Sequence, residues 1–216
     1  MERPVSELLF IRHGETDWNR QQRFQGQSDV PLNATGVLQA ARVAARLADD
    51  PHDAFFTSDL RRARQTAAPL AVAWRREPVS VSGLREQHFG LLEGLNVATI
   101  QARHPDLWAR WLEHDGDFAL PGGESLAQFH RRVLDTVREL ADQLGGRRAV
   151  LITHGGVLDM LWRSAHGEPI AGLRRCEIPN AGLNRLRWKD GSLVVERWAD
   201  DEHLRGLPEQ APTQGR

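Results

Sequence analysis

Two short apolar runs, far apart in the chain, end in the same pair of residues, a histidine followed by a glycine. The first run is Leu8–Ile11 in LLFIRHGE, and the second is Val150–Thr153 in VLITHGGV. Runs of this length and composition are typical of strands that are buried on both faces of a sheet. In open α/β sheets, ligands bind just beyond the carboxyl ends of such strands. The two runs therefore predict a sheet that brings His13 and His154 to one cleft.

Further strand-length runs alternate with helix-like segments along the rest of the chain. The additional predicted strands are Ala54–Thr57, Val79–Val81, Leu183–Trp188 and Leu193–Trp198. This alternation predicts an α/β fold, a three-layer αβα sandwich around a mostly parallel central sheet. A Lys-Asp-Gly turn separates the last two runs, which predicts an antiparallel hairpin and hence an antiparallel edge strand.

Capping residues mark where three helices should begin. Asn33 is placed to cap a helix that ends near Leu47, with an apolar face made of Val37, Leu38, Ala41 and Ala45. Ser58 is placed to cap a second helix, which carries Leu60, Ala63, Ala67 and Leu70. Ser125 and Gln128 form a capping-box pattern, and the helix that follows them should end at Gly145.

Composition narrows the class of protein. The 216 residues carry a net charge of −1 with a pI near 6.8, so we expect neither a nucleic-acid partner nor a membrane-surface partner. The one cysteine, Cys176, excludes an intramolecular disulfide and a cysteine-cluster metal site. The first apolar run is too short for a signal peptide or a membrane span, and we expect a cytoplasmic protein. We expect one domain over residues 1–198 and a flexible tail over 199–216.

The residues beside the first histidine favour phosphate chemistry. Arg12 precedes His13, and a guanidinium forks onto two phosphate oxygens. A histidine can attack phosphorus and carry the phosphoryl group, while a second, protonated imidazole would balance its charge. The competing hydrolase patterns are missing, because the sequence has no G-x-S-x-G elbow, no H-x-H or H-E-x-x-H spacing and no P-loop. Each histidine taken alone also fits a polar residue placed where a strand reaches the surface.

Five segments in one order resemble the histidine phosphatase superfamily, in its phosphoglycerate mutase-like branch and most closely its broad-specificity phosphatases. They are LLFIRHGETDWNRQQRFQGQSDVPLNATG (8–36), TSDLRRARQTA (57–67), LREQHFGLLEG (84–94), PGGES (121–125) and VLITHGGVL (150–158). An R-H-G triplet alone would be a weak signal, whereas five segments in the family's order cover most of the chain. The family needs no metal, so the resemblance implies an enzyme without a cofactor.

The resemblance also assigns roles to individual residues. It implies that His13 is the phosphorylated nucleophile, and that His154 is the second imidazole at the phosphoryl group. Arg12 and Arg62 would hold the phosphate, and Glu86 would give a proton to the leaving oxygen and then take one from water. Minor contributions to phosphate binding are implied for Asn19, Gln25 and Gly155. Arg61 should point away, because adjacent helical residues diverge by about 100°.

The resemblance implies a metal-independent phosphatase that hydrolyses small phosphate monoesters through a phosphohistidine. Its partner would be a small phosphorylated metabolite, which is the substrate. A 2,3-bisphosphoglycerate-dependent phosphoglycerate mutase is the alternative, which the compact chain and the stretch RFQGQSDVPL disfavour. A non-catalytic phosphate-binding module is a second alternative, in which Glu86 would have no use. The segment between Gly94 and Pro121 could cap the cleft, and a homodimer stays open.

Overall fold

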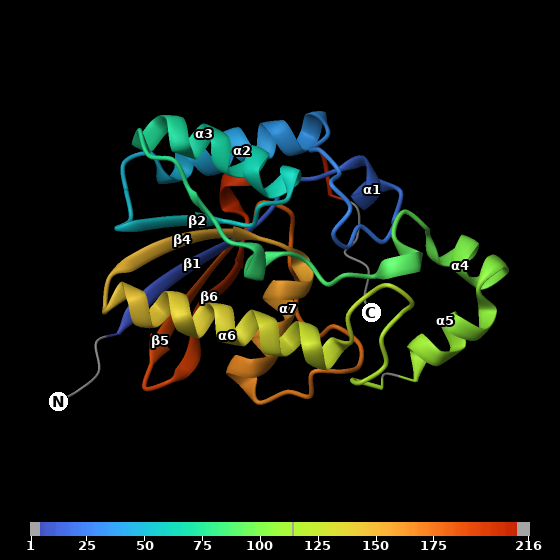
Figure 1. The fold of residues 1–216 in the computed structure, drawn as a ribbon. Helices are drawn as coiled ribbons and strands as arrows, with labels where there is room; N and C mark the ends of the chain where they lie inside the picture. The colour runs from blue at the N-terminus through green and yellow to red at the C-terminus, as the bar shows by residue number, and fades with distance from the viewer. Residues whose placement is uncertain (1–4, 114, 211–216) are drawn as a thin grey trace.

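The computed structural model describes residues 5–113 and 115–210, and Figure 1 shows their arrangement around one sheet. Six strands form this sheet in the order β3-β2-β4-β1-β5-β6. Their bounds are β1 Ser6–Arg12, β2 Ala54–Thr57, β3 Val79–Ser80, β4 Arg148–Thr153, β5 Leu183–Lys189 and β6 Ser192–Asp200. Strands β1 to β4 run parallel, whereas β5 pairs antiparallel with β1 and β6 antiparallel with β5. The predicted mostly parallel sheet with an antiparallel edge is confirmed.

The last two strands form the predicted hairpin. Its turn residues, Asp190 and Gly191, have φ values of 51° and 80°. Two successive residues with positive φ are the mark of a type I′ turn, whose twist matches that of the flanking strands.

Helices cover both faces of the sheet and complete three layers (Figure 1). Helices α2 (Ala34–Leu47) and α3 (Arg61–Trp74) lie on one face, and α6 (Leu126–Leu144) and α7 (Gly155–His166) lie on the other. Successive side chains of β1 point to opposite faces of the sheet, so they contact both helical layers. Leu8 and Phe10 belong to the core shared with α6 and α7, whereas Leu9 and Ile11 belong to the core shared with α2 and α3.

Helix α2 has the predicted cap at Asn33 and the predicted end at Leu47, but the predicted apolar face was wrong. Val37 and Leu38 are 54% and 52% exposed. The buried stripe consists instead of Thr35, Gly36, Gln39, Ala40, Val43, Ala44 and Leu47. The two stripes lie side by side on the helix, and the buried one includes the polar residues Thr35 and Gln39, which an apolar pattern does not mark.

The predicted cap of α3 was also wrong, whereas that of α6 is confirmed. Helix α3 begins after Leu60, and no side chain caps it. Ser58 instead points its hydroxyl at His154, as described below. Helix α6 has the Ser125 capping box with Gln128 and ends at Gly145, whose φ of 58° suits a glycine.

A smaller layer lies beside the sandwich, on the side of the carboxyl ends of β1 and β4. It contains α4 (Val97–Arg103) and α5 (Pro105–Leu112), which extend away from the sheet in Figure 1. Its apolar cluster consists of Phe24, Phe89, Leu92, Ile100 and Leu120, with Leu95, Val97, Trp108, Trp111 and Phe118 packed against it. The short elements that complete the fold are α1 (Asp17–Arg20) and the 3₁₀ turns η1 (Ser82–Leu84), η2 (Gly90–Leu92) and η3 (Glu202–Leu204).

Within the segment predicted as a flexible tail, residues 199–210 contact the domain, and residues 211–216 lie outside the described residues. Asp200 still belongs to β6, and Leu204 is only 8% exposed. The side chain of Gln210 accepts from the backbone N–H of Asn180 at 2.7 Å and donates to its carbonyl at 3.1 Å. Apolar burial and these bonds hold the segment against the domain despite its polar composition. No helix in the described ranges is long and apolar enough to cross a membrane.

Candidate active site

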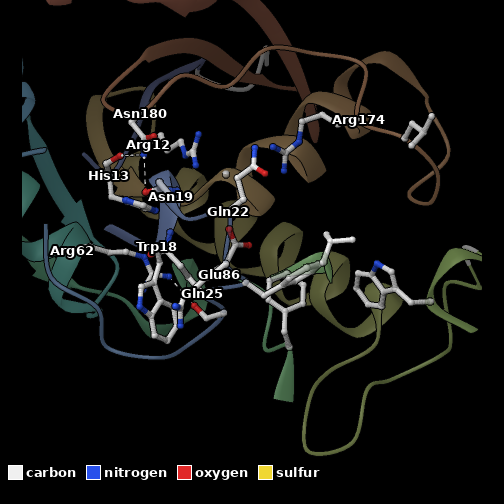
Figure 2. A pocket seen from close by; sticks show the side chains of 18 of the residues that line it. Arg12, His13, Trp18, Asn19, Gln22, Gln25, Arg62, Glu86, Arg174 and Asn180 are labelled. Atoms are coloured by element: carbon white, nitrogen blue, oxygen red, sulfur yellow. Dashed lines mark hydrogen bonds between the residues drawn. The ribbon is translucent and has the colours of Figure 1, made fainter. Parts of the chain in front are cut away.

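The carboxyl ends of β1 and β4 lie side by side, as the two His-Gly pairs predicted. Arg12 is in register with Thr153, so the histidines that follow them are neighbours. Their ring centroids are 5.1 Å apart. A cavity of about 340 Å³ opens at this point, and Figure 2 shows side chains converging on it from several elements. Its lining includes seven of the eight predicted site residues: Arg12, His13, Asn19, Gln25, Arg62, Glu86 and Gly155.

The imidazole of His13 is held in one orientation. Its Nδ1 lies 2.7 Å from the carbonyl oxygen of Gly14, which accepts a hydrogen bond from the ring. This bond assigns the proton to Nδ1 and leaves a lone pair on Nε2. Burial, together with the positive charges of Arg62 and Arg12, holds the pKa of His13 well below its usual value of 6.5. The ring is therefore neutral at physiological pH, as a nucleophile must be.

Two buried arginines flank this imidazole. Arg12 donates to the carbonyl of Ile178 at 2.6 Å, and Arg62 donates to the carbonyls of Ser28 and Gly26 at 2.9 and 2.7 Å. In the described part of the chain, the Nε atom of each arginine is buried without a hydrogen-bond partner. Burial lowers the pKa of Arg12 to about 9 and that of Arg62 to about 10, so both stay charged at neutral pH. The pocket thus presents two fixed cations to an anion.

His154 is fully buried behind His13, and its neighbour Gly155 forms the pocket wall. Its Nε2 lies 2.8 Å from the hydroxyl of Ser58. Its Nδ1 has no hydrogen-bond partner among the described residues. Burial and the positive charge of Arg62 hold the pKa of His154 well below 6.5. The second imidazole is therefore neutral in the free protein, whereas its predicted role in balancing charge requires a proton.

The carboxylate of Glu86 is fixed by backbone N–H groups. Gln87 donates to Oε1 and Gly156 donates to Oε2, both at 2.9 Å. Gly156 lies in the first turn of α7, and a Cβ atom there would come within 2.0 Å of Oε1 of Glu86. Only glycine at position 156 allows this approach. The second glycine of THGG therefore has a purpose that the sequence analysis missed.

The three residues predicted as minor contributors differ in how they are held. The Oδ1 of Asn19 accepts from the backbone N–H of Thr16 at 3.0 Å, in a capping box that opens α1. Its amide nitrogen is then the atom suited to a phosphate oxygen. Gln25 has a buried Oε1 without a hydrogen-bond partner in the described part of the chain. Gly155 begins α7, and a Cβ there would lie 3.4 Å from Nε of Arg12.

Three residues of the site were not predicted from the sequence. Ser58 orients His154, Asn180 donates to the carbonyl of His13 at 3.0 Å, and Arg174 lines the pocket. Figure 2 shows Asn180 beside His13, and Arg174 reaching in from the opposite side. Asn180 and Arg174 lie in the irregular segment between α7 and β5, where no periodic pattern reveals position. Ser58 was misread because a serine before a helix usually caps it.

The site has no cluster of metal-binding side chains among the described residues. In residues 5–113 and 115–210, no three His, Cys, Asp or Glu side chains cluster closely enough to hold a metal ion. Positive charge in the pocket comes from arginines instead.

Comparison with known proteins agrees with this geometry. The model of the histidine phosphatase superfamily (branch 1) matches residues 8–201. The chain is 33% identical to the metal-independent phosphoserine phosphatase of Arabidopsis thaliana, over 94% of this chain and 85% of that protein. It is 35% identical to the phosphoglycerate mutase-like protein 4 of the same plant, over 92% and 87%. The structure of YhfR from Bacillus stearothermophilus superimposes with a TM-score of 0.84 at 26% identity, over 93% of this chain and all of that one.

These matches cover nearly the whole chain, and they include the segments that carry the pocket. The chain therefore belongs to branch 1 of the histidine phosphatase superfamily.

Proposed function

We propose that His13 attacks the phosphorus of a phosphate monoester and carries the phosphoryl group as a phosphohistidine. The chain is a phosphoric monoester hydrolase, as its family and its phosphoserine phosphatase relative indicate. The observation that carries the proposal is the His13–Gly14 hydrogen bond, because it leaves Nε2 with a free lone pair between two buried arginines. A neutral imidazole in that position is an activated nucleophile.

In the first step, the Nε2 lone pair of His13 forms a bond to phosphorus while the ester P–O bond breaks. The leaving oxygen takes a proton from Glu86, which must enter this step protonated. Arg12 and Arg62 neutralise the phosphate dianion and the charge on its oxygens in the transition state. The Gly14 carbonyl stabilises the positive charge that the phosphorylated imidazole acquires, because it accepts the Nδ1 proton.

In the second step, water attacks the same phosphorus. Glu86 takes a proton from that water, the P–N bond breaks, and inorganic phosphate leaves with His13 neutral again. The backbone N–H groups of Gln87 and Gly156 hold the carboxylate in place through both steps. One carboxylate therefore acts first as an acid and then as a base.

His154 would act on the phosphoryl oxygens through Nδ1. The hydroxyl of Ser58 holds Nε2, so a proton on Nδ1 points away from Ser58. A bound dianion favours protonation of this buried ring and reverses the effect of the surrounding arginines. Asn19, Gln25 and the backbone of Gly155 would supply further hydrogen bonds to the phosphate.

A phosphoglycerate mutase is the alternative, because several relatives are mutase-like or probable phosphoglycerate mutases. Both reactions begin with phosphate on His13 and differ in whether water or a second substrate oxygen accepts it. With 3-phosphoglycerate we expect inorganic phosphate to exceed 2-phosphoglycerate, and 2,3-bisphosphoglycerate not to stimulate turnover. An aryl phosphate serves as positive control. Isomerisation that depends on bisphosphoglycerate and releases little phosphate would favour the mutase.

The direct test of the proposed function is phosphate release from an aryl phosphate after exhaustive chelation. Arg12, Arg62 and His154 supply the positive charge that a metal would otherwise provide, so activity should persist. Activity that a chelator abolishes and a divalent ion restores would contradict the mechanism. A protein that binds phosphate and releases none from any ester would instead be the non-catalytic module.

The proposed function also indicates what the protein binds. A small phosphorylated metabolite fits a cavity of about 340 Å³. Absence of nucleic-acid and membrane partners, a cytoplasmic location and a homodimer stay predictions. The balanced net charge of −1 supports the first of these.

A further inference from the structure

The cation Arg174 lies in the pocket beyond the two arginines that hold the phosphate. Four arginines but only one carboxylate, that of Glu86, are among the pocket-lining residues. A phosphate dianion balances the charges of Arg12 and Arg62. Arg23, the fourth arginine, sits at the exposed rim and donates to the carbonyl of Gly94 at 3.2 Å. Arg174 is the remaining arginine of the pocket, and a simple phosphate monoester offers it no anion.

Arg174 is also poorly satisfied within the protein. Its side chain is 8% exposed, and its Nε is buried without a hydrogen-bond partner among the described residues. Its nearest recorded anion is Asp159, at 3.8 Å. Asp159 is already shared with Arg163, whose Nε lies 3.2 Å from its other oxygen. A buried guanidinium with so weak a partner carries a desolvation cost that a bound anion would offset.

Hydrogen bonds from a buried arginine connect the loop that carries Arg174 to α7. Arg163 on α7 donates from its two terminal nitrogens to four backbone carbonyls of this loop, those of Pro169, Ala171, Gly172 and Leu173. With its bond to Asp159, all five N–H groups of Arg163 are used. Leu173 directly precedes Arg174. The position of Arg174 is therefore built by buried side chains rather than left to a free loop.

Arg174 lines the same pocket as Arg12 and Arg62, the two arginines assigned to the phosphate and here called the phosphate clamp. In Figure 2, Arg12 and Arg174 extend into the pocket from opposite sides, with the side chain of Gln22 between them and Glu86 below. The positive charge of Arg174 lowers the pKa of Arg12 more than that of Arg62 does, although burial is the largest cause. Glu86 is placed to protonate the leaving oxygen, so Arg174 faces the part of the substrate beyond the scissile bond. The aromatic side chains of Phe89, Trp108 and Trp111 also line the pocket and supply no charge.

We infer that Arg174 binds a second anionic group, a carboxylate or a further phosphate, on the alcohol portion of the substrate. The inference rests on the proposed function and deepens it by naming the substrate class. Substrates of this class carry one phosphate to His13 and one anion to Arg174. Neutral alcohol phosphates would lack the second contact.

A matched series of esters tests the inference. It consists of linear α,ω-diol monophosphates, the corresponding phosphonooxy carboxylates and the corresponding bisphosphates, with chain lengths of about two to six carbons. We expect kcat/KM, measured as initial phosphate release, to be about 10- to 100-fold higher for an anionic ester than for its neutral match at the best length, the scale of one charge-assisted hydrogen bond. The carboxylate and bisphosphate arms distinguish the two anions.

Variants assign this preference to one residue. Arg174→Gln should reduce the anionic-to-neutral ratio to near one, and Arg174→Lys should restore part of it. Arg175→Gln is the matched control, because Arg175 is 62% exposed and pairs with Glu168; its ratio should equal that of the wild type. Melting temperatures identify any variant that fails to fold. If Arg174→Gln does not fold, the anionic-to-neutral ratio of Arg174→Lys, which should fall below that of the wild type, tests the assignment.

The outcomes separate the two claims. Hydrolysis of all esters without preference for an anionic end at any length would overturn the inference alone. A preference that survives in Arg174→Gln would overturn the assignment to Arg174. Absence of hydrolysis from every ester, an aryl phosphate included, would overturn the proposed function and this inference with it.

Discussion

The two ends of the pocket are built in opposite ways. At the phosphate end, Arg62 and His154 are 0% exposed and His13 is 3% exposed, and each is bonded to backbone or to a buried hydroxyl. The other end, here called the cap end, is lined by side chains of α4 and α5. In it, α5 has no buried residue, and Trp108 and Trp111 are half-buried. The difference leads us to propose that the sandwich fixes the chemistry, while the more exposed side chains of α5 influence which leaving group fits.

The largest expected effect comes from replacing His13, the proposed nucleophile at the phosphate end. His13→Asn should lower kcat by on the order of 10⁴- to 10⁶-fold, the scale of losing a nucleophile. Circular dichroism should show a folded protein. His166→Asn is the control, because His166 is exposed and stacks on Trp162. Comparable damage from both substitutions would show that the loss reflects folding.

The next largest expected effect is a difference in kcat/KM between variants of two adjacent arginines of α3. Arg62→Gln should lower kcat/KM by about 10²- to 10³-fold, because a preorganised donor to a charged transition state is removed. Arg61→Gln should change it by less than about twofold, since Arg61 is exposed. Steady-state kinetics on one aryl phosphate gives both values. Equal losses would refute the assignment of the phosphate clamp to Arg62.

Acid should weaken the phosphate end. The pKa of His13 is held below 6.5 in the folded protein by burial and by Arg62 and Arg12, so the unfolded chain binds more protons as pH falls. The free energy of unfolding should then decrease as the pH falls below about 6.5, by up to about 2 kcal/mol at pH 5 for this histidine. Other buried histidines add to the total.

Urea unfolding of wild type and His13→Asn at pH 7 and pH 5 isolates this contribution. The decrease from pH 7 to pH 5 should be smaller in His13→Asn, because that variant has lost one titrating ring. Identical decreases in the two proteins would mean that His13 titrates normally in the fold.

The smallest expected effect is at the cap end. Trp111 packs edge-on against Phe24 and Phe89, with ring centroids 6.4 and 5.9 Å apart. Trp111→Ala should lower kcat/KM for a bulky aryl phosphate by about two- to tenfold, mainly through KM, the scale of one aromatic contact. A small alkyl phosphate should be affected less. Trp111→Phe is the conservative control, and a large fall in kcat on every ester would erase the distinction between the two ends.

The sequence predicted the phosphate end well because each of its residues follows a regular element or belongs to a recognisable motif. His13 and His154 end buried strands, and Arg62 lies in the first turn of a helix. Periodicity placed those strands and helices, and the α/β sandwich followed. Only the structure could show that Gly14 fixes the tautomer of His13, because a backbone carbonyl has no sequence signal.

Regions that the sequence misjudged lack such regularity. The apolar face of α2 was misassigned, because the buried stripe includes the polar residues Thr35 and Gln39, whose burial depends on tertiary contacts. Arg174 and Asn180 lie in an irregular segment, where only tertiary contacts determine what points into the pocket. The polar composition of residues 199–210 hid the burial of Leu204 and the bonds of Gln210.

Rapid-quench labelling with a substrate carrying radioactive phosphate tests the central claim, that His13 carries the phosphoryl group. The account predicts a transient label that survives alkaline quench and is lost in acid, because the bond is a phosphoramidate. It also predicts that the label maps to the peptide containing His13 and is missing from His13→Asn. A label that survives acid, lies on a serine, or persists in His13→Asn would contradict the account.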